Sequence, residues 1–175
     1  GYVLMMIAYS FLLKNIVLID VMIIAAGFVL RVLAGVVLVG VARFSPWLYV
    51  CTTLLALFLA VGKRRHELWL LKGNANTHRT ILEEYSIQFI DEMISILSST
   101  TLIAYSLYTF SAPNLPANDL MMLTIPFVLY GLFRYLYLIH VKEEGGTPED
   151  IVIQDRPLQA ALVLWAMAVV LILYT

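Results

Sequence analysis

The sequence predicts an all-α protein, a polytopic transmembrane helix bundle. Of its 175 residues, 62% are hydrophobic and only 13% are charged, whereas soluble domains usually carry about 25% charged residues. Mean hydropathy is +0.90, and several apolar runs approach the roughly 20 residues that a bilayer-spanning helix needs. We expect about five spans after a truncated first one, in a single transmembrane domain covering residues 1–175.

The expected spans follow one another with short polar breaks. Capping and proline signals mark three of the starts, because Ser45-Pro46 and Asp155-Arg156-Pro157 both place a cap before an early proline and Asp119 can cap the fifth span. In order, the segments are Gly1–Leu13 (the end of a span), Val21–Val41, Trp47–Val61, Phe89–Phe110, 119–140 and Leu158–Tyr174.

Two features inside these spans carry further expectations. Asp91 and Glu92 are expected in the first turn of the fourth span, where acidic side chains suit the helix dipole. Pro126 lies inside the fifth span and predicts a kink there.

The first residues, the net charge and the cysteine count limit further what kind of protein this is. The sequence opens with Gly1 inside an apolar run, without an initiator Met or a signal-peptide layout. We therefore expect it to be the C-terminal part of a longer chain whose N-terminal helices are missing. Net charge is -1, which gives no reason to expect nucleic acid as a partner. The single cysteine, Cys51, excludes an intrachain disulfide.

Basic residues predict the orientation in the membrane, because Lys and Arg concentrate in cytoplasmic loops. One side of the bundle would carry eight of the eleven basic residues, namely Lys14, Lys63, Arg64, Arg65, Lys72, Arg79, Lys142 and Arg156. The opposite side would carry only Arg43, with Arg31 and Arg134 inside spans. The ionised face, taken as cytoplasmic, is where phosphate chemistry is expected.

Arg31 is the most unusual single residue, since a guanidinium near mid-bilayer is costly unless it faces protein or a wet cavity. Asp20 shares its helix face but lies eleven residues earlier, about 16 Å along the axis, and cannot pair with it directly. Gly27 and Gly35 lie on that face and would allow close approach of a helix or ligand. Arg31 therefore either holds helices together or binds phosphate in a cavity.

A second cluster, Gly62-Lys63-Arg64-Arg65-His66-Glu67-Leu68, follows the third span. Such a cluster is commonly a topology anchor, but Glu67 among the bases would also suit a site for anions and a metal. Arg134, in the tyrosine-rich end of the fifth span, belongs either to an aromatic belt or to the same cavity as Arg31. Motifs for zinc, nucleotide or serine-hydrolase chemistry are absent from the sequence.

Ordered motifs run through nearly all of the chain: Tyr9-Ser10-x-x-Leu13-Lys14, Asp20-Val21, Ala26-Gly27-Phe28-x-Leu30-Arg31-x-x-Ala34-Gly35, Gly62-Lys63-Arg64-x-x-Glu67-Leu68, Pro126-Phe127-x-x-Tyr130-Gly131-x-x-Arg134-Tyr135, Gly145-Gly146-x-Pro148 and Asp155-Arg156-Pro157-Leu158. In these motifs the sequence resembles the UbiA-type superfamily of intramembrane prenyltransferases. Within it, the decaprenyl-phosphate phosphoribosyltransferase branch is the closer match.

The resemblance implies part of a nine-helix UbiA-like fold around a cavity open to the cytoplasm of a plasma (inner) membrane. It implies an enzyme that moves phosphoribosyl from phosphoribosyl pyrophosphate to a polyprenyl phosphate, releasing pyrophosphate with Mg²⁺ assistance, for cell-wall arabinan precursors. The aspartate-rich motif expected to hold the metal would precede Gly1, so this chain alone is expected to be inactive. Lys63–Glu67 replaces a second such motif of ordinary members, which favours the phosphoribosyl branch.

Phosphoribosyl pyrophosphate is a polyanion, so its site should recruit Lys and Arg clamps. On the resemblance and these charges, the candidates for the ribose-phosphate and pyrophosphate are Tyr9, Ser10, Lys14 and Arg31, with Lys63, Arg64 and Arg79 as further clamps. Asp20 and Glu67 are candidates for ribose hydroxyls or an outer metal shell. The alternatives are prenyl transfer to an aromatic acceptor and a non-catalytic helix bundle, and the sequence leaves homo-oligomerisation open.

Overall fold

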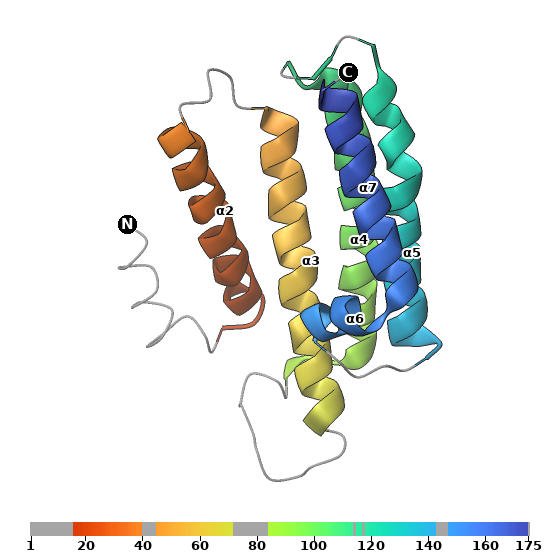
Figure 1. Cartoon of the computed structure of the whole chain (residues 1–175). Helices are drawn as coiled ribbons and strands as arrows, with labels where there is room; N and C mark the ends of the chain where they lie inside the picture. The colour runs from red at the N-terminus through yellow and green to blue at the C-terminus, as the bar shows by residue number, and fades with distance from the viewer. Residues whose placement is uncertain are drawn as a thin grey trace. The chain divides into compact units, whose positions relative to one another are not determined.

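The computed structural model describes residues 16–39, 45–71, 84–113, 115–116, 118–142 and 147–174, and these ranges contain helices and no strand. The elements are α2 (Ile19–Val39), α3 (Pro46–Leu71), α4 (Ile87–Ser111), the 3-10 helix η3 (Leu120–Thr124), α5 (Ile125–His140), α6 (Pro148–Gln154) and α7 (Arg156–Tyr174) (Figure 1). Five stretches are long and apolar enough to cross a membrane. The predicted all-α, multi-pass fold with about five spans is confirmed, while the expected first segment lies outside the described residues.

Contacts divide the chain into two compact units. Unit 1 comprises residues 1–44 and 52–97, and unit 2 comprises residues 45–51 and 98–175. Unit 1 thus holds α2, most of α3 and the first part of α4, while unit 2 holds the remainder. That all 175 residues form one domain stays a prediction.

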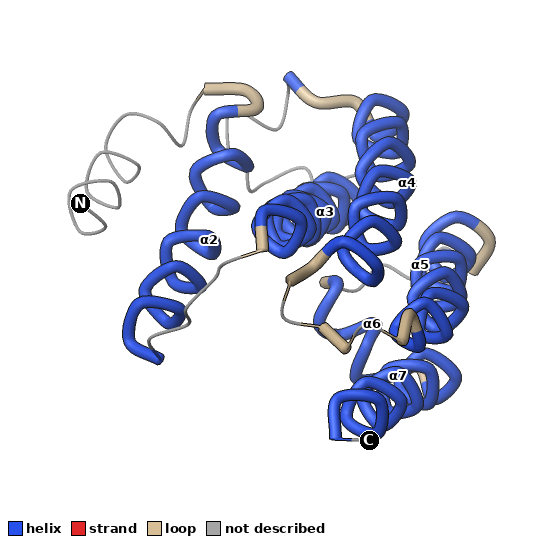
Figure 2. The backbone as a smooth tube through the Cα atoms, turned by 90° about the horizontal axis from the view of Figure 1, so that it is seen from above, coloured by secondary structure: helices blue, strands red, loops and turns tan. Residues whose placement is uncertain are grey.

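In unit 1, α2 lies beside α3, as both views show (Figures 1 and 2). Val21, Ala25 and Val29 recur every four residues along α2 and are its buried apolar stripe. On α3 the small residues Ala56 and Ala60 are buried, and small side chains let membrane helices approach closely. The described part of α2 thus packs by one stripe, whereas α3 also buries Phe58 and Val61 and is packed on more than one side.

Helix α3 begins where the sequence predicts. The hydroxyl of Ser45 accepts the Leu48 amide at 3.5 Å, and Pro46 takes the first helical position. The helix continues to Leu71, ten residues beyond the predicted end at Val61. The prediction followed apolarity, whereas residues 63–71 are rich in Lys, Arg, Glu and Leu, which are strong helix formers.

Helix α4 begins two residues before its predicted start. Ser86 caps it, because its hydroxyl accepts the Phe89 amide at 3.0 Å. The prediction that Asp91 and Glu92 occupy the first turn is wrong, since that turn has no acidic residue and both lie one turn further in. There the carboxylate of Asp91 accepts from Arg65 of α3, and that of Glu92 accepts from Gln88 of α4 itself.

In unit 2, α5 and α7 pack against each other, and η3 and α6 both contact α7. A polar group is buried among these helices: the Tyr105 hydroxyl lies 2.5 Å from the Thr124 hydroxyl and accepts the Trp165 indole N–H at 2.7 Å. Thr124 is 0% exposed. Because unpaired polar groups are costly in an apolar interior, this network fixes α4, η3 and α7 in one register.

The fifth predicted span differs from expectation at its start. Asp119 has φ 54 and makes no side-chain capping bond, so the predicted cap is wrong. The Asn118 side chain instead accepts the Leu120 amide at 3.2 Å. Pro126 stands at the beginning of α5 and not within it, because the preceding five residues form η3. The predicted mid-helix kink is thus replaced by a change of helix type.

A short helix that the sequence interpretation missed, α6, precedes α7. Thr147 and Asp150 form a reciprocal capping box, with the Thr147 hydroxyl accepting the Asp150 amide and the Asp150 carboxylate accepting the Thr147 amide. Asp155 then caps α7 as predicted, since its carboxylate accepts the Leu158 amide at 2.8 Å. Two successive caps therefore turn the chain into its last span.

Candidate functional site

A buried ion pair joins α2 to α3 in unit 1. Asp20 stands in the first turn of α2 and is 1% exposed, and Arg64, in the last third of α3, is 4% exposed. Arg64 Nε lies 2.9 Å from Asp20 Oδ2, and Arg64 Nη1 also pairs with Glu67 one turn along α3. Two charges so deeply buried are tolerated only when they neutralise each other.

Tyr85 completes this cluster from the segment that leads into α4. Its hydroxyl donates to Asp20 Oδ1 at 2.9 Å and accepts the backbone N–H of Leu18 at 2.7 Å. Burial, and next the hydrogen bond to the anionic Asp20, raise the pKa of Tyr85 to about 12, although the Leu18 amide opposes them. The phenol therefore keeps its proton at physiological pH and acts as donor to Asp20.

A second ion pair joins α3 to α4. Arg65 Nε donates to Asp91 Oδ1 at 2.6 Å, and these side chains are 12% and 24% exposed. The beginnings of α2 and α4 thus lie at the same end of α3 within unit 1. The sequence predicted that the ionised connectors share one side, and these contacts join five charged residues near that end of α3, namely Asp20, Arg64, Arg65, Glu67 and Asp91.

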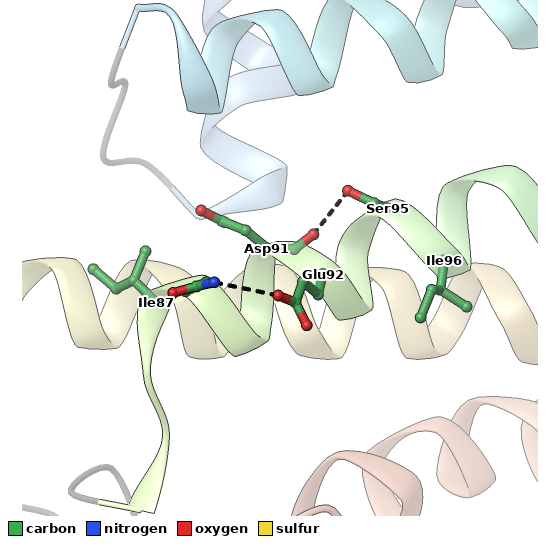
Figure 3. A pocket seen from close by; sticks show the side chains of 6 residues that line it. Ile87, Asp91, Glu92, Ser95 and Ile96 are labelled. Atoms are coloured by element: carbon green, nitrogen blue, oxygen red, sulfur yellow. Dashed lines mark hydrogen bonds between the residues drawn. The ribbon is translucent and has the colours of Figure 1, made fainter.

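A depression of about 710 Å³ lies beside the second pair, along the first turns of α4 (Figure 3). It is open and is lined by Ile87, Gln88, Asp91, Glu92, Ser95 and Ile96. Gln88 reaches Glu92 at 3.5 Å, and the Ser95 hydroxyl donates to the Asp91 carbonyl at 2.9 Å (Figure 3). Its polar groups are thus largely engaged with one another.

The other predicted site residues of unit 1 occupy different environments. Lys63 and Glu67 are half-buried on the turn of α3 that carries Arg64. Arg31 is exposed on α2, with its guanidinium 5.3 Å from the centre of the Phe28 ring. A side chain at Gly35 would meet nothing within 4 Å, so the predicted close approach there is not seen among the described residues.

Arg134 belongs to unit 2 and forms a bidentate pair. Its Nε and Nη2 donate to Asp155 at 3.2 and 2.8 Å, and its guanidinium lies 5.2 Å from the Tyr137 ring centre. The hydrogen bond from Arg134 holds the pKa of Asp155 below its ordinary value, with help from the Leu158 amide. Because the same carboxylate caps α7, this pair connects the second half of α5 to the start of α7.

Four predicted binding residues, Tyr9, Ser10, Lys14 and Arg79, lie outside the described residues. Their roles stay predictions. The structure therefore brings together Asp20, Arg64 and Glu67 from the predicted set, with Lys63 on the same turn.

The described residues do not supply a metal site. Within the described ranges, no three His, Cys, Asp or Glu side chains gather as ligands. The carboxylates of Asp20, Glu67 and Asp91 are each paired with an arginine. The expectation that a metal would be held by an aspartate-rich motif elsewhere is neither supported nor opposed by these contacts.

Sequence reasoning missed three members of these clusters as partners: Tyr85, Asp91 and Asp155. Tyr85 is 65 residues from Asp20, and Asp91 is 26 residues from Arg65. A usable signal was the even mixture of acidic and basic residues on one predicted side, which implies pairing without saying which residues pair.

Fold and clusters together define a multi-pass helical membrane protein in whose described part Arg64, Arg65 and Arg134 pair with acidic residues of other elements. Over 94% of its length the chain is 31% identical to the decaprenyl-phosphate phosphoribosyltransferase of Mycolicibacterium smegmatis, of which it covers 54%. It is 26% identical over 99% of its length to that of Corynebacterium glutamicum, and 28% identical over 96% to that of Mycobacterium tuberculosis.

These likenesses confirm the resemblance to the decaprenyl-phosphate phosphoribosyltransferases. The chain covers 52% of the Corynebacterium glutamicum protein and 55% of the Mycobacterium tuberculosis protein, so it spans about half the length of the curated relatives it matches. No protein-family model matches the chain.

Proposed function

We propose that the protein takes part in transfer of phosphoribosyl from phosphoribosyl pyrophosphate to a polyprenyl phosphate, with decaprenyl phosphate as the acceptor. The observation that carries the proposal is the likeness, over 94% to 99% of the chain, to proteins named for this lipid acceptor and this transferred group. The reaction would serve cell-wall arabinan precursors and take place on the cytoplasmic side of the plasma membrane.

The geometry of unit 1 supports an amphiphilic acceptor. Ionised side chains gather where α2, α3 and α4 meet, while large apolar side chains such as Met22, Leu55 and Ile96 are exposed along the same helices. A lipid phosphate has the same two parts, an anionic head and an apolar tail. Its tail would lie along the exposed helix faces.

In the proposed reaction the bond from the anomeric carbon to pyrophosphate breaks, and pyrophosphate leaves with the electron pair. A bond from the same carbon to an oxygen of the lipid phosphate forms. That oxygen is already ionised, so no strong base is required, and the protein contributes orientation and electrostatic stabilisation. We assign Lys63 to the phosphates, together with Tyr9, Ser10, Lys14, Arg31 and Arg79.

Mg²⁺ would neutralise the pyrophosphate leaving group, bound by residues other than those described here. The resemblance places the aspartate-rich metal motif outside residues 1–175, and we therefore expect these residues alone to be inactive. Removing divalent cations with a chelator should abolish turnover of the full-length gene product, and added Mg²⁺ should restore it.

The decisive experiment measures pyrophosphate release by the full-length gene product in proteoliposomes. Release is expected with phosphoribosyl pyrophosphate and decaprenyl phosphate together and with neither alone. Release with a prenyl diphosphate and an aromatic acceptor instead would establish the alternative transferase activity. No release with either pair would favour a non-catalytic bundle.

Two lysine variants make the test residue-specific. Lys63→Ala should lower kcat/KM roughly tenfold or more, as expected for loss of a charge-assisted phosphate contact. Lys142→Ala, the same change at an exposed residue just past α5, should leave it unaltered. Equal kcat/KM in the two variants would contradict the assignment of Lys63.

A further inference from the structure

Tyr85 makes two long-range hydrogen bonds with one hydroxyl group. Its O–H donates to Asp20 and its oxygen accepts from the Leu18 amide, residues that lie 65 and 67 positions away in sequence. The ring is 6% exposed and stacks on Phe89 with ring centroids 6.3 Å apart. Both the direction and the depth of the hydroxyl are therefore fixed by its surroundings.

The Leu18 contact holds an unusual backbone conformation. Leu18 has φ 67, a left-handed conformation that costs a leucine about 1–2 kcal/mol. Such a residue keeps this conformation only when neighbouring contacts determine it. Since Leu18 immediately precedes α2, its conformation sets the direction in which the chain enters that helix.

Through its hydrogen bond to Asp20, Tyr85 is also linked to α3. Asp20 receives Tyr85 on one oxygen and faces Arg64 at 2.9 Å on the other, and Arg64 pairs in turn with Glu67. An unbroken series of polar contacts thus runs from Leu18 through Tyr85, Asp20 and Arg64 to Glu67. The turn of α3 that this series holds also carries Lys63.

We propose that Tyr85 is a positioning residue of the phosphoribosyl pyrophosphate site, which fixes the chain entering α2 and, through Asp20 and Arg64, the turn of α3 that carries Lys63. The inference rests on the proposed function for its substrate. Tyr85 itself need not contact substrate, because its one hydroxyl hydrogen is already donated to Asp20 and cannot also be donated to a phosphate. On this assignment Asp20 and Arg64 act through the residues they hold in place.

The test variant is Tyr85→Phe in the full-length gene product, with Tyr174→Phe as the matched control at an 89% exposed tyrosine. Hydrogen exchange at the Leu18 amide should accelerate about tenfold in Tyr85→Phe, because its acceptor is lost. The KM for phosphoribosyl pyrophosphate should rise about fivefold to tenfold with kcat within about twofold, the pattern of weakened ground-state and transition-state binding alike. Tyr174→Phe should match the wild type in both measurements.

A merely structural tyrosine would give a different pattern. It would lower the amount of active protein, and hence apparent kcat, with KM unchanged, and that result would overturn the proposal. Faster Leu18 exchange with unchanged KM, or unchanged exchange, would also overturn it. If the wild type releases no pyrophosphate but Tyr85→Phe accelerates Leu18 exchange, the proposed function fails while the fixing of the α2 entry by Tyr85 stands.

Discussion

Arg64 illustrates how a charged side chain is held inside a membrane protein. It is 4% exposed and faces two carboxylates, Asp20 at 2.9 Å and Glu67 one turn along its own helix. Replacing such a pair by apolar groups can be neutral, whereas removing one partner leaves a buried charge uncompensated. The pair therefore makes each member dependent on the other.

Arg64→Met should destabilise the protein strongly, because Asp20 then stays buried without its cation. We expect the free energy of unfolding to fall by about 3–5 kcal/mol, measured by denaturant unfolding in detergent micelles. Adding Asp20→Asn removes the remaining charge and should recover about half of the loss. Simple additivity of the two single changes would contradict the coupling.

Asp155 predicts a pH dependence in unit 2. Its folded pKa is lowered from 3.8, chiefly by the hydrogen bond from Arg134. A depressed folded pKa means that the stabilisation is complete above the unfolded value and is lost as pH falls through the folded one. Thermal unfolding should therefore show a drop in midpoint below about pH 4, and Asp155→Asn should have a lower midpoint at pH 7 and a smaller drop below pH 4.

At the scale of elements, helix ends depend on a few side-chain caps. Ser45, Ser86 and Asp155 each accept the amide three residues later, at the starts of α3, α4 and α7. In α6 the cap is reciprocal between Thr147 and Asp150. A seven-residue helix has little intrinsic stability, so its cap contributes a large share.

Thr147→Ala should loosen α6 without unfolding the spans. Loss of an N-cap hydroxyl costs about 1 kcal/mol, so hydrogen exchange of the α6 amides should rise roughly fivefold. Thr147→Ser keeps the hydroxyl and should exchange as the wild type does. Equal exchange in Ala and Ser variants would show that tertiary contacts alone hold α6.

Apolar runs predicted the spans because a helix that crosses the bilayer needs a run of apolar residues long enough to span the hydrocarbon core. They did not predict the continuation of α3 to Leu71, since helix formation there depends on propensity and ion pairing. Nor did they show η3, because Pro126 fits both a kinked helix and a helix start. The cap at Thr147 was readable from its spacing to Asp150, but the short helix it begins is not an apolar run.

The sequence predicted several charged residues of the candidate site but not which of them pair with each other. Sequence placed Asp20 and Arg64 on the same side of the membrane, yet 44 residues separate them and no local rule pairs residues at that distance. Only the tertiary structure shows that Tyr85 bonds to Leu18 and Asp20. The predicted roles of Tyr9, Ser10, Lys14 and Arg79 stay predictions.

For the whole molecule, the distribution of basic residues sets the expected sidedness. The segment after α3 carries Lys72 and Arg79, whereas the segment between α4 and η3 carries no Lys or Arg. Basic loops remain in the cytoplasm. Because α4 is long enough to cross the bilayer, its two ends should face opposite compartments.

Single-cysteine labelling in intact cells checks this topology. In a Cys51→Ser background, Asn118→Cys should react with a membrane-impermeant maleimide, and Gln88→Cys should react only after the cells are permeabilised. Both positions are exposed in the structure, so reactivity reports the side of the membrane and not burial. Labelling of Gln88→Cys in intact cells would invert the predicted orientation.

The pairing of Arg64 and Arg65 with acidic residues affects how a highly charged ligand can bind to unit 1. Because each guanidinium already faces a carboxylate, these two arginines themselves add little net positive charge where α2, α3 and α4 meet. The charge of a bound polyanion would therefore have to be neutralised by cations that it brings with it or by other basic residues of the chain.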